Sequence, residues 1–214
     1  MRVSIIDCQM GNIGSIVNII RYIGFDVDVI NSPEDILKAD KLIFPGVGHW
    51  NNGVQQLEES GLKPAILEAV NNKKTPFLGI CLGMQLLFDT SEEGDKSGLG
   101  IVPGKVVKFD FGMLEIKERT GAKKLRIPHM GWNDVTLVGD DNLVRQSLSP
   151  ELSYYFVHSF HASSVPKEYQ LMTCHYGYDF VCAVNKENVW GFQFHPEKSH
   201  KFGMELLSYF LERT

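Results

Sequence analysis

The sequence predicts an α/β protein whose sheet is mostly parallel and doubly wound, with antiparallel strands added to it. Through residue 90, short apolar segments alternate with segments of helical spacing, which is the pattern of βαβ units. Beyond residue 100, strand-like segments follow one another with short turns, which favours antiparallel pairing. A length of 214 residues with 43% apolar content fits one compact domain over 1–214.

The first half opens with a clear strand–helix unit. Residues 2–6 (RVSII) predict a buried strand that ends in a turn at 7–11. Isoleucines at helical spacing predict a helix over 12–23, which Gly24 ends. By the same criteria, the next elements are a strand at 25–30, a helix whose N-cap and first turn are 32–35, a strand at 41–44, a helix at 62–71, a strand at 76–80 and a helix at 82–88.

The second half is rich in short strands. β-Branched and aromatic residues between turns predict strands at 102–110, 135–138, 154–158, 170–176, 181–185 and 189–194. Helical spacing over 202–212 closes the chain with a helix. No internal repeat or linker divides these elements, so they belong to the same predicted domain.

The composition argues against several classes of partner. Net charge is −5 and the basic residues form no stripe, so no nucleic-acid partner is expected. No segment reaches membrane-spanning length and the apolar start is too short for a signal peptide, so we expect a cytoplasmic protein without membrane contact. The cysteines at 8, 81, 174 and 182 have no CxxC spacing and no nucleotide motif is present, so neither a metal nor a cofactor is expected.

Cys81 is the cysteine whose surroundings indicate chemistry. Gly79-Ile-Cys-Leu-Gly83 follows a predicted strand and opens a helix, as in a nucleophile elbow with Cys in place of Ser. The helix N-terminus favours the thiolate, and the N–H of Leu82 is expected to face a bound carbonyl oxygen. The alternative is a buried cysteine between two packing glycines.

A cysteine nucleophile needs a base, and His195 is the best placed of the seven histidines. It ends a predicted strand, and Pro196 favours an extended backbone, so Glu197 lies two residues away on the same face. A carboxylate there could orient the imidazole as the third member of a triad. The alternative for His-Pro-Glu is a surface turn.

The third element of the predicted site is the glycine-rich loop Pro45–Gly48, which ends another predicted strand. Its glycines let backbone N–H groups approach a ligand, and one of them could complete an oxyanion hole with the N–H of Leu82. No Gly-Lys-Ser/Thr follows, which excludes a phosphate-binding loop. The alternative is an ordinary strand-to-helix connection.

Five segments follow one another along the chain, and the similarity that they carry covers essentially all of it: PGVG, GICLGMQLL with SEEG behind it, PHMGWN, YFVHSFHA and GFQFHPEKS. Together they resemble the triad (class I) glutamine amidotransferases and, more narrowly through PHMGWN and HPEKS, the glutaminase subunits of imidazole glycerol phosphate synthases. The resemblance implies a flavodoxin-like glutaminase architecture. It also implies hydrolysis of glutamine at Cys81, with His195 as base and then acid and Glu197 as the orienting group.

The resemblance further implies a substrate site and a partner. Glu93 would lie near the α-amino group of glutamine, although a solvated acid in the run SEEGD is the alternative. The partner would be a (β/α)8 cyclase subunit that forms a heterodimer, receives ammonia through a protected path, and makes imidazole glycerol phosphate and an aminoimidazole carboxamide ribotide in histidine biosynthesis. The implied residues are Gly48, Gln85, Glu93, Tyr155, His158 and Ser159 for glutamine; Val47, Gly48 and Leu82 for the oxyanion hole; and Asn12, Met130, Trp132, Asn133 and Lys198 for the interface.

Members of this family are near-inactive until the partner binds its ligand, which implies a Val47 peptide that must turn. Two departures from the family pattern weaken the narrower assignment and leave a second reading open, although the histidine-pathway reading stays ahead: Cys8-Gln9 stands where the family has Tyr-Gly, and the segment 109–126 is longer than usual. The opening GNIGSI is reminiscent of paralogues that supply ammonia to a sugar amidotransferase in surface-polysaccharide synthesis.

Rivals from other classes share only some of these features. A stand-alone cysteine hydrolase or peptidase would use the elbow but not SEEG or PHMGWN. A non-catalytic regulatory module would be favoured by loss of a triad member, and all three are present. A metal site would need His195, Glu197 and another histidine to converge.

Overall fold

The structure, a computed structural model, describes residues 3–112, 125–139 and 142–214. Within these ranges one sheet follows the strand order β2-β1-β3-β4-β12-β11-β10-β7-β8, with β5, β6 and β9 joined at its side. The strands are β1 (Val3–Ile6), β2 (Val27–Ile30), β3 (Lys41–Gly46), β4 (Phe77–Cys81), β5 (Thr90–Ser91), β6 (Lys105–Lys108), β7 (His129–Leu137), β8 (Ser153–His158), β9 (Phe160–Ser163), β10 (Gln170–Tyr176), β11 (Tyr178–Lys186) and β12 (Val189–Phe192).

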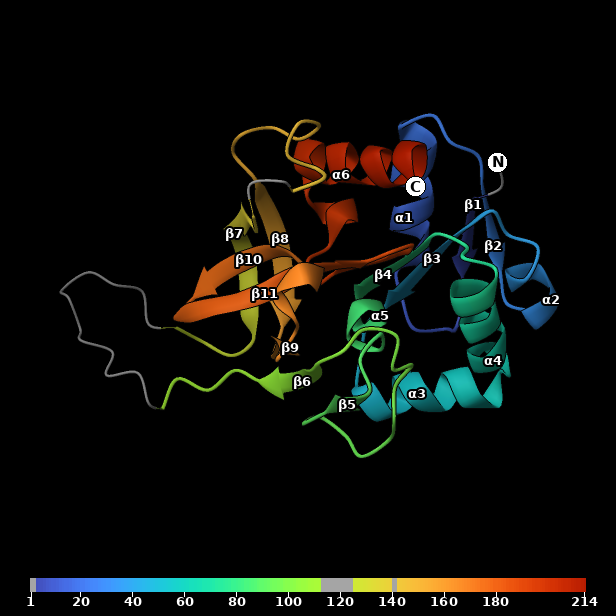
Figure 1. The fold of residues 1–214 in the computed structure, drawn as a ribbon, viewed down its shortest axis with the longest axis horizontal. Helices are drawn as coiled ribbons and strands as arrows, with labels where there is room; N and C mark the ends of the chain where they lie inside the picture. Colours follow the sequence, from blue (N-terminus) through green and yellow to red (C-terminus); the bar gives the residue numbers. More distant parts are fainter. Residues whose placement is uncertain (1–2, 113–124, 140–141) are drawn as a thin grey trace.

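The first five strands of this order are parallel, and the remaining pairs along it are antiparallel. The parallel part has the 2-1-3-4-5 order of flavodoxin-like sheets, with β12 as its fifth strand. The antiparallel strands form the lobe at the left of Figure 1. This confirms the predicted fold class, a mostly parallel doubly wound sheet with added antiparallel strands.

Helices cover both faces of the parallel strands. In Figure 1, α1 and α6 lie on one side of the sheet, whereas α3 and α4 lie on the other. No helix among the described residues is both long enough and apolar enough to cross a bilayer. The helices are α1 (Ile13–Tyr22), α2 (Pro33–Ile36), α3 (Trp50–Glu59), α4 (Leu62–Leu67), α5 (Leu82–Gln85) and α6 (His200–Arg213), with a π-helical turn η1 (Glu68–Asn72) and 3-10 turns η2 (Lys167–Tyr169) and η3 (Pro196–Lys198).

Alternation along the strands divides the interior into two cores. In β3, Leu42 and Phe44 pack with the α3 and α4 side, whereas Ile43 between them packs with α1 and α6. Successive side chains of a strand point to opposite faces, and here both faces are covered. This is why the parallel strands are almost continuously apolar, and why they were predictable from the sequence.

Several elements of the structure differ from the prediction; strands β5 and β9, for example, were not predicted, and the strand predicted at 102–110 is limited to β6. Helix α3 was not predicted, because Asn-Asn-Gly at 51–53 is typical of a turn; yet Trp50, Gly53, Val54 and Leu57 have helical spacing and are buried. Helix α5 ends at Gln85, earlier than predicted. Strand β7 begins at His129, so PHMGWN is largely strand, and most of the long segment 109–126 lies outside the described residues.

Candidate functional site

The site lies where three neighbouring parallel strands end. Cys81 is the last residue of β4, Gly46 ends β3 beside it, and β12 ends at Phe192. Because β3, β4 and β12 are adjacent and parallel, the three motifs predicted from the sequence meet at the carboxyl edge of the sheet. That edge is where α/β folds place their ligands.

The backbone of Cys81 has the sharp conformation of a nucleophile elbow. Its φ of 55° lies in the left-handed region, which a non-glycine residue rarely adopts. A Cβ on Gly79 would lie 2.5 Å from the Gly83 carbonyl oxygen, and one on Gly83 would lie 2.0 Å from that of Phe44. Both glycines are therefore required for the strand and the following turn to pack this closely.

His195 is held between the sheet and a carboxylate. Its backbone N–H donates to the Tyr155 carbonyl at 2.9 Å, and its Nδ1 lies 2.8 Å from Oε1 of Glu197. The His195 and Glu197 side chains are only 4% and 3% exposed, so their hydrogen bond is shielded from water. The structure therefore places Glu197 beside the ring, on the geometry expected for residues two apart in an extended segment.

The pKa of His195 follows from these neighbours. Burial opposes a charge on the ring, but interactions with Cys81 and Glu197 outweigh it and raise the pKa to about 10. The Nε2 atom of His195 is buried and has no hydrogen-bond partner among the described residues. This nitrogen is available for proton exchange with the reacting groups.

A cavity of about 320 Å³ opens beside Cys81 and His195. It contains nearly all the residues predicted for catalysis and for glutamine, although Glu197 lies behind His195 and Tyr155 lies outside the lining. Pro128, Val157 and Phe160 were not predicted. The lining residues are Val47, Gly48, Cys81, Leu82, Gln85, Glu93, Pro128, Val157, His158, Ser159, Phe160 and His195.

Of the three residues predicted for the oxyanion hole, Leu82 and Val47 differ in whether their backbone N–H is already hydrogen-bonded. Leu82 begins α5, so its N–H has no acceptor within the helix. The N–H of Val47 instead donates to the Met10 carbonyl at 2.5 Å. The next residue, Gly48, has a φ of +119°, a conformation that glycine adopts readily. The Val47 N–H is thus already hydrogen-bonded to the loop after β1 and cannot donate to a bound oxyanion.

Glu93 lines the cavity, and a backbone hydrogen bond holds its carboxylate in place. Its Oε2 accepts the backbone N–H of Trp50 at 2.8 Å, at the N-terminus of α3. A carboxylate is stabilised at such a helix end. The side chain is half-buried rather than fully solvated, so the structure favours the pocket position over the solvated-acid alternative.

Two polar residues beside the site were missed from the sequence. Gln193 is fully buried, and its Nε2 lies 3.9 Å from Sγ of Cys81. Ser199, also fully buried, donates from Oγ to the His195 carbonyl at 2.6 Å and accepts the Tyr155 N–H at 3.0 Å. The available signal was the spacing in Gln-Phe-His, because Gln193 and His195 are two apart in an extended segment.

The residues predicted for a partner interface lie on several elements. Asn12 caps α1, and Lys198 lies over the Tyr155 ring at 5.7 Å from its centroid. Met130 and Trp132 on β7 are 62% and 46% exposed, and Trp132 stacks on His200 at 5.3 Å. Large exposed apolar side chains of this kind mark interaction surfaces. Asn133 hydrogen-bonds to the His175 carbonyl at 2.9 Å.

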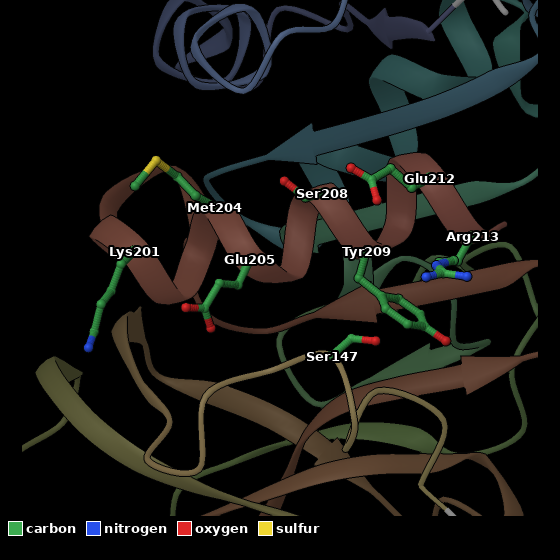
Figure 2. Close-up of a pocket in the computed structure, with 8 residues that line it drawn as sticks. All are labelled: Ser147, Lys201, Met204, Glu205, Ser208, Tyr209, Glu212 and Arg213. Atoms are coloured by element: carbon green, nitrogen blue, oxygen red, sulfur yellow. The ribbon is translucent and has the colours of Figure 1, made fainter.

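Elsewhere, the described residues form no metal site, although they line further cavities. No group of three or more His, Cys, Asp and Glu side chains among them is placed to hold a metal ion. A second cavity, of about 400 Å³, lies along α6 and shares no lining residue with the cavity at Cys81. Figure 2 shows Glu205 there, and both of its carboxylate oxygens are bound by Ser149.

Residues 4–213 match the family model described as glutamine amidotransferase class-I. Imidazole glycerol phosphate synthase subunit HisH 2 of Methanococcus maripaludis is 46% identical, over 99% of this chain and 100% of that protein. A subunit of the same name from Pseudomonas aeruginosa is 42% identical, over 97% and 98%. The chloroplastic imidazole glycerol phosphate synthase hisHF of Arabidopsis thaliana is 41% identical, over 98% of this chain and 34% of that longer protein.

A solved structure described as a glutamine amidotransferase superposes with a TM-score of 0.74 at 18% identity, over 98% of this chain and 97% of that one. PurLQS from Thermotoga maritima gives a TM-score of 0.70 at 14% identity, over 98% and 97%. At such identities the likeness concerns the fold.

Proposed function

Because the chain belongs to the class I glutamine amidotransferases and, within them, to the HisH subunits of imidazole glycerol phosphate synthase, we propose that it hydrolyses glutamine through Cys81, His195 and Glu197. The observation that carries this proposal is the buried His195, which lines one cavity together with Cys81 and is hydrogen-bonded to Glu197. The products are glutamate and ammonia.

The reaction proceeds in two acyl-transfer steps. The thiolate of Cys81 attacks the side-chain amide carbon of glutamine, and a C–S bond forms. As the C–N bond breaks, the imidazolium of His195 gives its proton to the departing nitrogen, which leaves as ammonia. Water then loses a proton to His195 and attacks the thioester; the C–O bond forms, the C–S bond breaks and glutamate leaves.

Each supporting group has a defined task. With a pKa of about 10, His195 is protonated at neutral pH and ready to act as the acid of the first step. Glu197 holds Nδ1–H and thereby fixes the orientation of the ring. Glu93 binds the α-ammonium of glutamine. His158, whose pKa is lowered to about 3 by burial, is neutral and serves with Gln85 and Ser159 as a hydrogen-bonding wall.

The oxyanion hole is incomplete in this arrangement. The N–H of Val47 is bound to the Met10 carbonyl, which leaves the N–H groups of Leu82 and Gly48 as the predicted donors to a tetrahedral intermediate. Loss of one such donor slows acyl transfer by roughly 100- to 1,000-fold. We infer that the free subunit is a slow glutaminase and that the Val47 peptide turns when the enzyme is activated.

The partner we propose is a (β/α)8 cyclase subunit, bound as a heterodimer in the cytoplasm. The relative named hisHF supports a close association, because this chain matches only 34% of its length. Exposed Met130 and Trp132, with Asn12, Asn133 and Lys198, would form the docking surface. The cyclase would receive the ammonia and make imidazole glycerol phosphate and the aminoimidazole carboxamide ribotide of histidine biosynthesis.

The decisive experiment measures glutamate release by the chain alone and with the cyclase, with and without the ribonucleotide substrate of histidine synthesis. We expect slow release alone and strong stimulation by the ribonucleotide. Cys81→Ser should abolish glutamine-dependent synthesis and retain synthesis from ammonium salt, whereas Cys174→Ser, at a buried cysteine of β10, should retain both. Glutamine hydrolysis by Cys81→Ser would refute the nucleophile.

One outcome would change the proposed acceptor of the ammonia but not the proposed chemistry at Cys81. Glutaminase activity that ignores the ribonucleotide but still requires Cys81 would favour the paralogous function, with ammonia passed to a sugar amidotransferase. Gln9, one of the two departures from the family pattern, directly precedes Met10, whose carbonyl accepts the Val47 N–H.

A further inference from the structure

Gln193 lies against the sulfur of Cys81 because of the register between β12 and β4. These strands are parallel, with Phe192 opposite Ile80, so the next residues along each strand are neighbours. The backbone of Gln193 is fixed by its N–H bond to the Cys182 carbonyl at 2.9 Å. Its side chain is fully buried, and Nε2 is 3.9 Å from Sγ.

The hydrogen-bond network determines which end of the Gln193 carboxamide faces the sulfur. The Phe160 carbonyl can only accept a hydrogen bond, so the Gln85 atom 3.0 Å from it is the donor Nε2. The same nitrogen donates to Oε1 of Gln193 at 3.1 Å. With Oε1 engaged as acceptor, the N–H group of Gln193 must point to Cys81.

We propose that Gln193 is a positioning residue of the glutaminase reaction, which donates an N–H hydrogen bond to the Cys81 thiolate and holds it toward His195. The inference rests on the proposed role of Cys81 as nucleophile. A thiolate accepts a stronger hydrogen bond than a neutral thiol, and the effect is larger where water is excluded. The donor therefore favours the reactive form of the cysteine.

A neutral donor matters here because the other sources of stabilisation are limited. The helix that follows Cys81 has only four residues, so few aligned peptide dipoles point at the sulfur. The titratable groups facing it are His195, His158 and Glu93 on the cavity wall, with Glu197 behind His195. Of these, His195 supplies the positive charge, and Gln193 supplies a donor that does not change with pH.

The test is the pH dependence of Cys81 alkylation by iodoacetamide in the full chain. Burial raises the pKa of Cys8 and Cys174 to about 12 and also raises that of Cys182, so these thiols react slowly. Gln193→Met keeps the length of the side chain but removes the donor. In this variant we expect the rise of the Cys81 alkylation rate with pH to begin at a higher pH. Alkylation at pH 7 should fall about three- to tenfold.

Turnover should change in the same sense. We expect kcat for glutamine hydrolysis to fall by a similar factor in Gln193→Met, with little change in KM, because the lost contact is to the nucleophile and not to substrate. Gln193→Glu, which removes the donor and adds a carboxyl group, should have the larger effect. The matched control is Gln170→Met, at a half-buried glutamine that donates to the Val165 carbonyl at 2.7 Å.

An unchanged alkylation profile in a folded Gln193→Met would overturn the proposal. If that variant fails to fold, Gln85→Met tests the same contact, because it removes the donor that orients Gln193; it should shift the profile in the same direction. The profile is read without glutamine, so it is independent of the proposed function. Should Cys81→Ser still hydrolyse glutamine, the function would fail, whereas the Gln193 contact would stand or fall on alkylation.

Discussion

Single buried hydroxyl and amide groups position the reactive side chains of this protein. Ser199 is an example, because its Oγ joins the His195 carbonyl to the Tyr155 N–H. Together with the direct bond from the His195 N–H to the Tyr155 carbonyl, the serine joins the segment around η3 to β8. The orientation of His195 depends on a side chain that never meets the substrate.

We expect Ser199→Ala to weaken both stability and catalysis. The substitution leaves the Tyr155 N–H buried without its acceptor, which costs about 1–3 kcal/mol in the free energy of unfolding. Because His195 loses an anchor, kcat should also fall several-fold. Urea unfolding and glutamate release measure the two effects. The control is Ser149→Ala, which breaks a hydrogen bond to Glu205 on α6 and should leave kcat unchanged. A normal kcat in a folded Ser199→Ala protein would contradict the positioning role of Ser199.

A second residue-scale prediction concerns Gln9. Its φ of 58° is in the left-handed region, and its N–H donates to Oδ1 of Asp7 at 2.7 Å. A non-glycine residue pays about 1 kcal/mol for this conformation, so Gln9→Gly should raise the free energy of unfolding by roughly 0.5–1 kcal/mol. Equilibrium urea unfolding tests this. The family's Tyr-Gly opening is thereby understood, since glycine fits this backbone without strain; a Gln9→Gly protein no more stable than the parent would contradict this explanation.

At the scale of elements, β7 and β8 are joined through a pair of buried histidines. His129 Nδ1 lies 3.2 Å from His158 Nε2, and His158 Nδ1 lies 2.7 Å from the Phe160 carbonyl. The carbonyl requires a proton on Nδ1 of His158, which leaves its Nε2 to accept from His129. Both rings are therefore neutral, and burial lowers their pKa values to about 4 and about 3.

This pair predicts a loss of stability in mild acid. Unfolded histidines titrate near 6.5, so between pH 6.5 and 4 the unfolded state binds more protons than the folded state. Stability is thus complete above pH 6.5 and falls as the pH is lowered, by about 2 kcal/mol for each histidine at pH 5. Urea unfolding at pH 7.5 and 5.0 measures the loss. His129→Gln should reduce this loss of unfolding free energy, whereas His175→Gln, at an exposed site, should not. An equal loss between pH 7.5 and 5.0 in both variants would contradict the role given to the buried histidine pair.

At the scale of the whole molecule, exposed apolar side chains line two cavities that share Pro128: Val47 lines the cavity at Cys81, and Met130 and Trp132 line the other. Val47 beside the cavity and Met130 and Trp132 on β7 are each at least 46% exposed. Trp132 stacks on His200 at the start of α6, which connects this surface to the segment that carries His195 and Glu197. A partner that covers this surface would contact the site without entering the core.

We therefore expect Trp132→Ala to weaken binding of the cyclase and leave the free chain folded. Tryptophan at the centre of an interface commonly contributes about 2 kcal/mol or more, so Kd should rise about 30-fold. Titration calorimetry with the isolated cyclase measures it. Leu143→Ala, at another 45% exposed apolar residue, is the control. A Kd unchanged by Trp132→Ala would exclude this surface as the docking site.

Local sequence signals predicted much of the fold and the central site residues. Apolar runs marked β1, β3 and β4 because both faces of those strands are buried, and glycines marked the turn at Cys81 because no Cβ fits there. Helix α3 was missed, because Asn-Asn-Gly is typical of a turn unless tertiary packing covers it. The start of β7 was missed because Pro128 and Gly131 interrupt the pattern that identifies a strand.

The sequence by itself therefore determined the α/β class and the alternation of elements and singled out Cys81, His195 and Glu197 as the candidate triad, because each signal is encoded within a few neighbouring residues. Tertiary structure alone decided the contact of Gln193 with Cys81, the pairing of His129 with His158 and the direction of the Val47 N–H. These depend on strand order and register, which join residues far apart in the chain. No local period specifies such contacts, since each is fixed only when the whole sheet has assembled.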